Sequence, residues 1–156
     1  MEIIESGNIF DSNAQTLVNT VNCVGVMGKG LALQFKKRFP SMFVEYVKIC
    51  NKGLLDVGKL WLFKTENRWI LNFPTKYDWR YPSKEEYLEL GLQKFVDTYQ
   101  KRGITSVAFP LLGASNGGID PAISLQIMES YLKQCEIPVS IYLSYNQNDL
   151  GLFDEI

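Results

Sequence analysis

The segment 19–38 constrains the fold most, because an apolar strand runs through a glycine-broken loop directly into an amphipathic helix. Gly25, Gly28 and Gly30 fall within six residues, so backbone N–H groups can approach a bound anion without interference from Cβ atoms. The helix that follows directs the positive end of its dipole at the same place. The segment predicts a phosphate-binding loop, and the alternative is a glycine turn without a ligand.

Residues 25–30 match neither of the common nucleotide-binding signatures. A Walker A loop has about four residues between its first glycine and a Gly-Lys-Ser/Thr sequence, and this loop lacks both that spacing and the hydroxyl. The glycine pattern of the dinucleotide-binding fold is also absent from these residues. A phosphate-binding loop of another type is the remaining interpretation.

The composition indicates one domain without a general affinity for nucleic acids. At 156 residues, with 46% hydrophobic and 21% charged, the chain is predicted to fold as a single domain over 1–156. Sixteen Lys and Arg against 17 Asp and Glu leave a net charge of -1, so no basic field covers the whole molecule. Any contact with DNA or RNA must therefore be local.

Cysteine and histidine usage excludes several kinds of site. Cys23, Cys50 and Cys135 are far apart and odd in number, which argues against a disulfide framework and against zinc. Histidine is absent, which removes the commonest metal ligand and every Ser/His or Cys/His nucleophile. No apolar run reaches the ~18 residues of a membrane span, and no basic-then-apolar leader begins the sequence. We therefore expect a soluble cytoplasmic domain with no metal, no cofactor and no membrane contact.

Apolar runs alternate with helical patterns, which predicts an α/β fold. Two runs joined by 65–68 indicate a hairpin, so the sheet should be mixed, with helices on both faces. Ser83 with Glu86 predicts a capping box, and Asp120 before Pro121 predicts a second helix cap. The predicted strands lie near 2–5, 16–22, 59–64, 68–73, 105–109 and 139–144, and the predicted helices near 29–38, 41–51, 84–101 and 121–134.

Two further loops follow predicted strands, where open α/β sheets bind their ligands. Residues 111–118 are again small and glycine-rich and open a helix, so two facing loops would suit a diphosphate. Residues 75–82 combine Lys76 and Arg80 with three aromatic side chains, a mixture suited to a stacked base beside a phosphate. An exposed loop pinned to the core by Trp79 is the alternative for this segment.

Together these segments resemble the macrodomains, which bind ADP-ribose between two phosphate loops on a three-layer α/β/α sandwich. Residues 19–30, 72–76, 79–80 and 112–118 are similar to the DarG-type DNA ADP-ribosyl glycohydrolase antitoxins, relatives of the terminal ADP-ribose protein glycohydrolases. The resemblance covers nearly the whole chain and implies a mixed sheet of about six strands. It implies an enzyme that removes ADP-ribose from thymidine bases of single-stranded DNA, with a DarT-type toxin as partner.

The resemblance also implies which residues hold ADP-ribose. Asn8 and Ile9 would lie by the adenine, and the amide of Asn22 would orient the distal ribose, unless Asn22 only forms the turn at the strand end. The two loops would hold the diphosphate. The implied ADP-ribose-binding residues are Asn8, Ile9, Val24, Gly25, Val26, Met27, Gly28, Lys29, Gly30, Leu112, Gly113, Ala114, Ser115, Asn116 and Gly117.

Lys76 would be the catalytic residue, acting with Asn22. Partial burial lowers the pKa of a lysine, so a neutral fraction can act as base or nucleophile near neutral pH. Lys76 would either attack the anomeric carbon of the distal ribose or polarise the groups around the breaking bond. The candidates for DNA contact are Thr75, Tyr77, Trp79 and Arg80.

Two positions depart from the pattern of the related families. Protein-directed enzymes have an aspartate where this chain has Gly117, and Asp120 is better interpreted as a helix cap, which favours a DNA substrate. Tyr77-Asp78 replaces an expected basic or histidine-containing pair, so the DNA contacts should differ. The alternatives are a hydrolase of glutamate-linked ADP-ribose or ADP-ribose esters, and a module that binds ADP-ribose without turnover.

Overall fold

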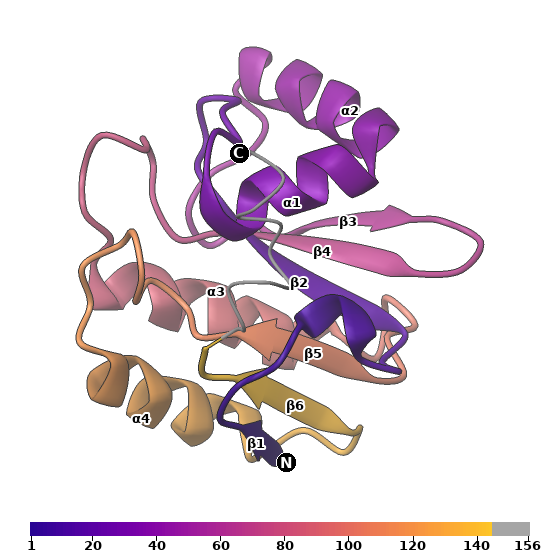
Figure 1. Cartoon of the computed structure of the whole chain (residues 1–156), viewed down its shortest axis with the longest axis vertical. Helices are drawn as coiled ribbons and strands as arrows, with labels where there is room; N and C mark the ends of the chain where they lie inside the picture. The colour runs from indigo at the N-terminus through magenta and orange to yellow at the C-terminus, as the bar shows by residue number, and fades with distance from the viewer. Residues whose placement is uncertain (145–156) are drawn as a thin grey trace.

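The computed structural model describes residues 1–144 as a mixed six-stranded sheet between two layers of helices (Figure 1). The strand order is β1-β6-β5-β2-β4-β3, and neighbours are parallel except for the antiparallel pair β3 and β4. The predicted three-layer sandwich with a mixed sheet is therefore confirmed. The elements are β1 (Glu2–Ile4), a 3-10 helix η1 (Ile9–Asp11), β2 (Thr16–Val21), α1 (Gly30–Arg38), α2 (Pro40–Asn51), β3 (Trp61–Lys64), β4 (Trp69–Pro74), α3 (Glu85–Thr98), β5 (Val107–Pro110), α4 (Pro121–Leu132) and β6 (Val139–Tyr142).

A separate apolar core lies on each face of the sheet, because strand side chains alternate between the two sides. Leu17 and Val21 of β2 pack with α1 and α2, whereas Val18 between them packs with α3 and α4. Leu71 and Phe73 of β4 join Val18 in the second core, and all three side chains are fully buried. Figure 1 shows α1 and α2 on one side of the sheet and α3 and α4 on the other.

The register of the parallel strands brings three loops to one edge of the sheet. Val21 at the end of β2 is paired with Pro74 at the end of β4, and β5 lies on the other side of β2. The loops that follow these strands therefore meet at their carboxyl ends. They are loop 1 (residues 22–29), the segment 75–84 and loop 2 (residues 111–118).

The helix ends confirm one predicted cap and contradict the other. Asp120 accepts the N–H of Ala122 at 2.8 Å and caps α4, as predicted. The capping box at Ser83 is wrong, since α3 begins at Glu85 and no side chain caps it. The backbone N–H of Ser83 instead donates to Gly117 O of loop 2 at 2.9 Å, so a tertiary contact overrides the local signal.

Other ends differ from the sequence pattern by a few residues, and η1 is an element that the pattern does not predict. The side chain of Asn8 accepts the N–H of Phe10 at 2.9 Å and caps η1. The hairpin between β3 and β4 closes as predicted, with Thr65 N donating to Arg68 O at 3.0 Å. Within residues 1–144, no helix combines the length and the apolar character needed to cross a bilayer.

Candidate active site

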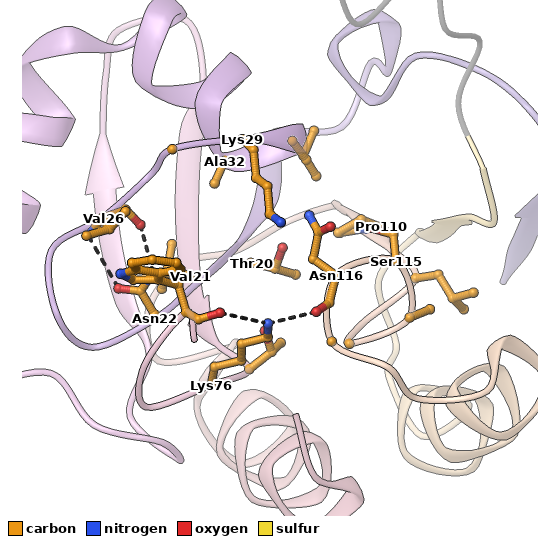
Figure 2. A pocket seen from close by; sticks show the side chains of 18 residues that line it. Thr20, Val21, Asn22, Val26, Lys29, Ala32, Lys76, Pro110, Ser115 and Asn116 are labelled. Carbon is orange, nitrogen blue, oxygen red and sulfur yellow. Dashed lines mark hydrogen bonds between the residues drawn. The ribbon is translucent and has the colours of Figure 1, made fainter. Parts of the chain in front are cut away.

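A cleft of about 340 Å³ opens at the carboxyl edge of the sheet, between loop 1 and loop 2 (Figure 2). Its size suits a small-molecule ligand. The floor comes from the ends of β2 and β5, one wall from loop 1 and the start of α1, and the other from loop 2. The lining residues are Thr20, Val21, Asn22, Val26, Gly28, Lys29, Leu31, Ala32, Thr75, Lys76, Trp79, Pro110, Leu111, Gly113, Ala114, Ser115, Asn116 and Gly117.

Three glycines shape loop 1 and its junction with α1: Gly25 and Gly30 allow the turns, and Gly28 leaves an open approach. Gly25 and Gly30 have φ of 86° and 62°, in the left-handed region that favours glycine. Gly28 has no such φ, and a Cβ placed there would meet only Val26 Cγ1 at 3.5 Å. The backbone at Gly28 therefore lies bare toward the cleft, as a phosphate-binding loop requires.

The side chain of Asn22 closes the turn of loop 1 from within. Its Nδ2 donates to Val26 O at 2.8 Å, and its Oδ1 accepts the N–H of Val24 at 3.0 Å. The hydroxyl of Tyr46 on α2 lies 2.8 Å from both Asn22 Oδ1 and Asn22 O. Tyr46 is fully buried, and burial raises the pKa of its hydroxyl, so it stays a neutral donor. The amide of Asn22 thus shapes the loop as well as lining the cleft.

Loop 2 packs too tightly at Gly117 to accept a side chain. A Cβ at this position would lie 2.6 Å from Ser83 Oγ and would also collide with the carbonyl of Gly113. The turn is further fixed by Ile119 N, which donates to Gly113 O at 3.0 Å. No carboxylate can therefore occupy position 117 without moving loop 2 and the segment before α3.

Lys76 lines the cleft. It follows Thr75, whose backbone N–H donates to Val21 O at 3.0 Å. Its Nζ donates to Asn116 O of loop 2 at 2.7 Å and to Trp79 O at 3.4 Å (Figure 2). Burial lowers the pKa of Lys76, and the positive charge of Lys29 lowers it further. The amine is thus held in place, and its neutral form is more accessible than in an ordinary lysine.

Lysine side chains give the cleft a positive charge. Lys29 and Lys76 line it, Figure 2 shows Lys29 directed into the space between the loops, and neither lysine forms an ion pair within residues 1–144. Among residues 1–144, no Asp or Glu lines the cleft, and the same part of the chain holds no cluster of three metal-ligating side chains. This charge pattern suits a dianionic diphosphate.

The four candidates for DNA contact have different surroundings. Thr75 and Trp79 line the cleft. Tyr77 lies edge-on to Tyr87 with ring centroids 5.2 Å apart, and Asp56 raises the pKa of its hydroxyl. Arg80 is bound to Asp78 through two short contacts, Nη2–Oδ2 at 2.6 Å and Nε–Oδ1 at 3.0 Å.

That pair affects the charge available for DNA. The hydrogen bonds from Arg80 hold the pKa of Asp78 at about 2, so the carboxylate stays ionised. The guanidinium of Arg80 is therefore already paired, and an added phosphate would have to compete with Asp78.

The structure brings about half of the implied ADP-ribose-binding residues to the cleft and leaves the others outside its lining. Ile9 is the first residue of η1 and is fully buried, and Met27 and Leu112 are core side chains, so only the backbone of these three residues could meet a ligand. The adenine position at Asn8 and Ile9 stays a prediction. The other implied residues outside the lining are Val24, Gly25 and Gly30.

Sequence reasoning missed two groups of residues. Five such residues line the cleft at strand ends and in the first turn of α1, places that the strand-to-loop pattern indicates only in general: Thr20, Val21, Leu31, Ala32 and Pro110. Tyr46 lies outside the cleft yet holds Asn22, and its helix pattern indicates only a core position.

Comparison with known proteins agrees with this geometry. The Macro domain family model matches residues 18–128. A DNA ADP-ribosyl glycohydrolase of Mycobacterium tuberculosis is 42% identical over 142 residues, which cover 88% of this chain and 40% of that protein. One from Thermus aquaticus is 45% identical over 129 residues, covering 80% and 36%. The chain thus spans about two fifths of the length of these curated relatives.

Solved structures show the same arrangement. The macrodomain of Mycobacterium tuberculosis DarG has a TM-score of 0.86 at 43% identity and covers 90% of this chain and 96% of that one. Thermosipho africanus DarTG in complex with ADP-ribose has a TM-score of 0.85 at 39% identity, covering 92% and 42%. With a family model that matches most of its length, two glycine-rich loops and a cleft between them, this chain belongs to the Macro domain family.

Proposed function

We propose that this domain removes ADP-ribose from thymidine bases in single-stranded DNA and so reverses the action of a DNA ADP-ribosyltransferase toxin. The relatives named DNA ADP-ribosyl glycohydrolase support the reaction. A Thermosipho africanus relative, 40% identical, is a fusion of a DNA ADP-ribosyl transferase with a DNA ADP-ribosyl glycohydrolase, which supports a toxin partner. The proposed place of action is the cytoplasm, where bacterial DNA lies.

The cleft supports ADP-ribose as the bound group. Loops 1 and 2 line opposite walls of it with glycine-rich backbone, and Lys29 adds a positive charge, which together suit the diphosphate. The distal ribose then lies toward Asn22 and Lys76, with the adenosine at the opposite end near Asn8 and Ile9. This orientation puts the anomeric carbon on the side of Lys76.

One observation carries the catalytic part of the proposal: Lys76 lies at the proposed reacting end of a cleft that no carboxylate of residues 1–144 lines. Hydrolysis of glycosidic bonds ordinarily depends on a pair of carboxylates. Here the amine must take over one of their roles. Its lowered pKa increases the neutral fraction that can attack or accept a proton, and its protonated form can polarise the leaving base.

The test compares two substrates in parallel. A single-stranded oligonucleotide carrying ADP-ribosyl-thymidine and a protein carrying glutamate-linked ADP-ribose are each incubated with the domain, and free ADP-ribose is followed. The variants are Lys76→Ala, Lys76→Arg and, as a matched control, Lys37→Ala, which removes an exposed lysine of α1 outside the cleft. Affinity for ADP-ribose is measured separately by calorimetry.

Release from DNA that both Lys76 variants lose, with ADP-ribose still bound, is the expected result. Release from protein alone would move the domain to a protein-directed hydrolase. No release from either substrate, with ADP-ribose bound, would leave a binding module. Equal loss of release and binding in Lys76→Ala would refute a chemical role for Lys76.

A further inference from the structure

The segment 77–83 is fixed at both ends to the walls of the cleft. Near its start, Tyr77 O accepts the N–H of Cys23 in loop 1 at 2.9 Å. At its end, Ser83 N donates to Gly117 O in loop 2, also at 2.9 Å. The segment therefore spans from one phosphate loop to the other at the edge of the cleft.

Between these ends, residues 78–81 form a turn that is held internally, here called the aromatic turn. Tyr81 N donates to Asp78 O at 3.2 Å, and the side chain of Asp78 accepts the N–H of Arg80 at 3.0 Å. The ion pair between Asp78 and Arg80 closes the same turn. A turn fixed in this way presents its side chains without a large ordering cost on binding.

Two aromatic side chains of the turn are exposed on its surface, and the guanidinium of Arg80 lies over the ring of Trp79, 5.8 Å from its centroid. Trp79 is 51% exposed and lines the cleft beside Lys76, whereas Tyr81 is 64% exposed and lies outside the lining. Tyr81 is the most exposed large apolar side chain within residues 1–144. Core packing explains neither exposure, and exposed aromatic rings next to a ligand cleft are typical of stacking surfaces.

We propose that Trp79 and Tyr81 form a stacking surface for bases of the DNA strand, with Trp79 at the modified thymidine and Tyr81 at its neighbour. The proposal rests on the proposed DNA substrate. Stacking is favoured over phosphate contact because the cation of this turn, Arg80, is already paired with Asp78. The net charge of -1 supplies no general attraction for the strand either.

The experiment uses three ligands that share the modified nucleoside, two of which differ only in their flanking bases. They are ADP-ribosyl-thymidine as a nucleoside, a short oligonucleotide with that nucleoside at its centre, and the same oligonucleotide with abasic sites on both sides. Dissociation constants are measured in a Lys76→Ala background so that no product forms. Because one stacked base contributes about 5- to 150-fold in affinity, the normal oligonucleotide should bind at least 5-fold more tightly than the abasic one.

Variants then locate the effect. Tyr81→Ala should reduce the ratio of the affinities for the normal and the abasic oligonucleotide to about one, and Tyr81→Trp should restore this ratio. The control is Val44→Ala on α2, a similarly exposed apolar side chain at 52%, which should leave the ratio unchanged. The ratio should also change little with salt, whereas a phosphate contact would weaken steeply.

The stacking surface would be overturned if the affinity ratio were one in the protein with Trp79 and Tyr81 unchanged. It would also be overturned if Tyr81→Ala left the ratio unchanged. Release of ADP-ribose from the nucleoside ligand by the chain with Lys76 tests the proposed function independently. Release of ADP-ribose together with an affinity ratio of one would overturn the stacking surface and leave the proposed function standing. A preserved ratio without any release would overturn the glycohydrolase and leave the stacking surface standing.

Discussion

Tyr46→Phe removes one hydroxyl from beneath loop 1 and leaves the packing of α2 unchanged. The hydroxyl lies 2.8 Å from two acceptors, Asn22 O and Asn22 Oδ1, but it has a single proton to donate. After its loss, Oδ1 still accepts from Val24 N, whereas Asn22 O loses the hydroxyl as its donor. One buried hydrogen bond of this kind contributes about 1 to 2 kcal/mol to the free energy of unfolding.

That loss should lower Tm by roughly 2 to 8 °C in a domain of this size. Because Asn22 would hold the turn of loop 1 less firmly, we also expect affinity for ADP-ribose to fall about 5- to 10-fold, equivalent to about 1 kcal/mol. Thermal denaturation measures the first effect and calorimetry with ADP-ribose the second.

Tyr99→Phe is the matched control, because it makes the same chemical change in the core on the opposite face of the sheet. Tyr99 is 4% exposed, and its hydroxyl accepts the N–H of Glu136 at 3.0 Å. This variant should lose similar stability and keep its affinity. If Tyr46→Phe behaves as Tyr99→Phe does, the inferred link from α2 through Asn22 to the ligand is wrong.

Three further variants probe the walls of the cleft. Gly28→Val should leave Tm nearly unchanged, since a Cβ there meets only Val26 at 3.5 Å, yet weaken ADP-ribose binding at least about tenfold; unchanged calorimetric affinity would count against loop 1 as the phosphate site. Gly117→Ala should lower the free energy of unfolding by about 1 to 3 kcal/mol, because its Cβ would lie 2.6 Å from Ser83 Oγ; a denaturant titration without a shift would disprove this crowding. Lys29→Gln removes a charge that lowers the pKa of Lys76, so that pKa should rise and the rising limb of kcat plotted against pH should move to higher pH. A shift to lower pH would contradict a neutral Lys76 as the active form.

The layers of the fold could be predicted from the sequence because strand and helix periods are local properties. The ends of elements could not always be predicted, since Ser83 has the residue type of a cap but its backbone is bound to Gly117, far along the chain. Loop 1 was predictable from its glycines. The position of Ile9 in the core was not, because a single apolar residue carries no sign of which side it faces.

The candidate site, too, could be predicted from the sequence only in part. The placement of Lys76 in the cleft is as expected, and its pKa is lowered as its predicted role requires. The contacts of Asn22 within loop 1 fit the alternative of a turn former, and nothing in the sequence pattern indicates its partner Tyr46. A hydrogen bond between residues 22 and 46 depends on how α2 packs against the sheet, which no local pattern encodes.

The crowding around Gly117 also limits how a protein of this shape can change over evolution. An aspartate at this position would place its Cβ against Ser83 and the carbonyl of Gly113. A single Gly117→Asp change would therefore disrupt loop 2 before it supplied a catalytic acid. An aspartate at position 117 therefore requires at least one enabling change in the segment before α3, and selection on activity alone would not favour that first step.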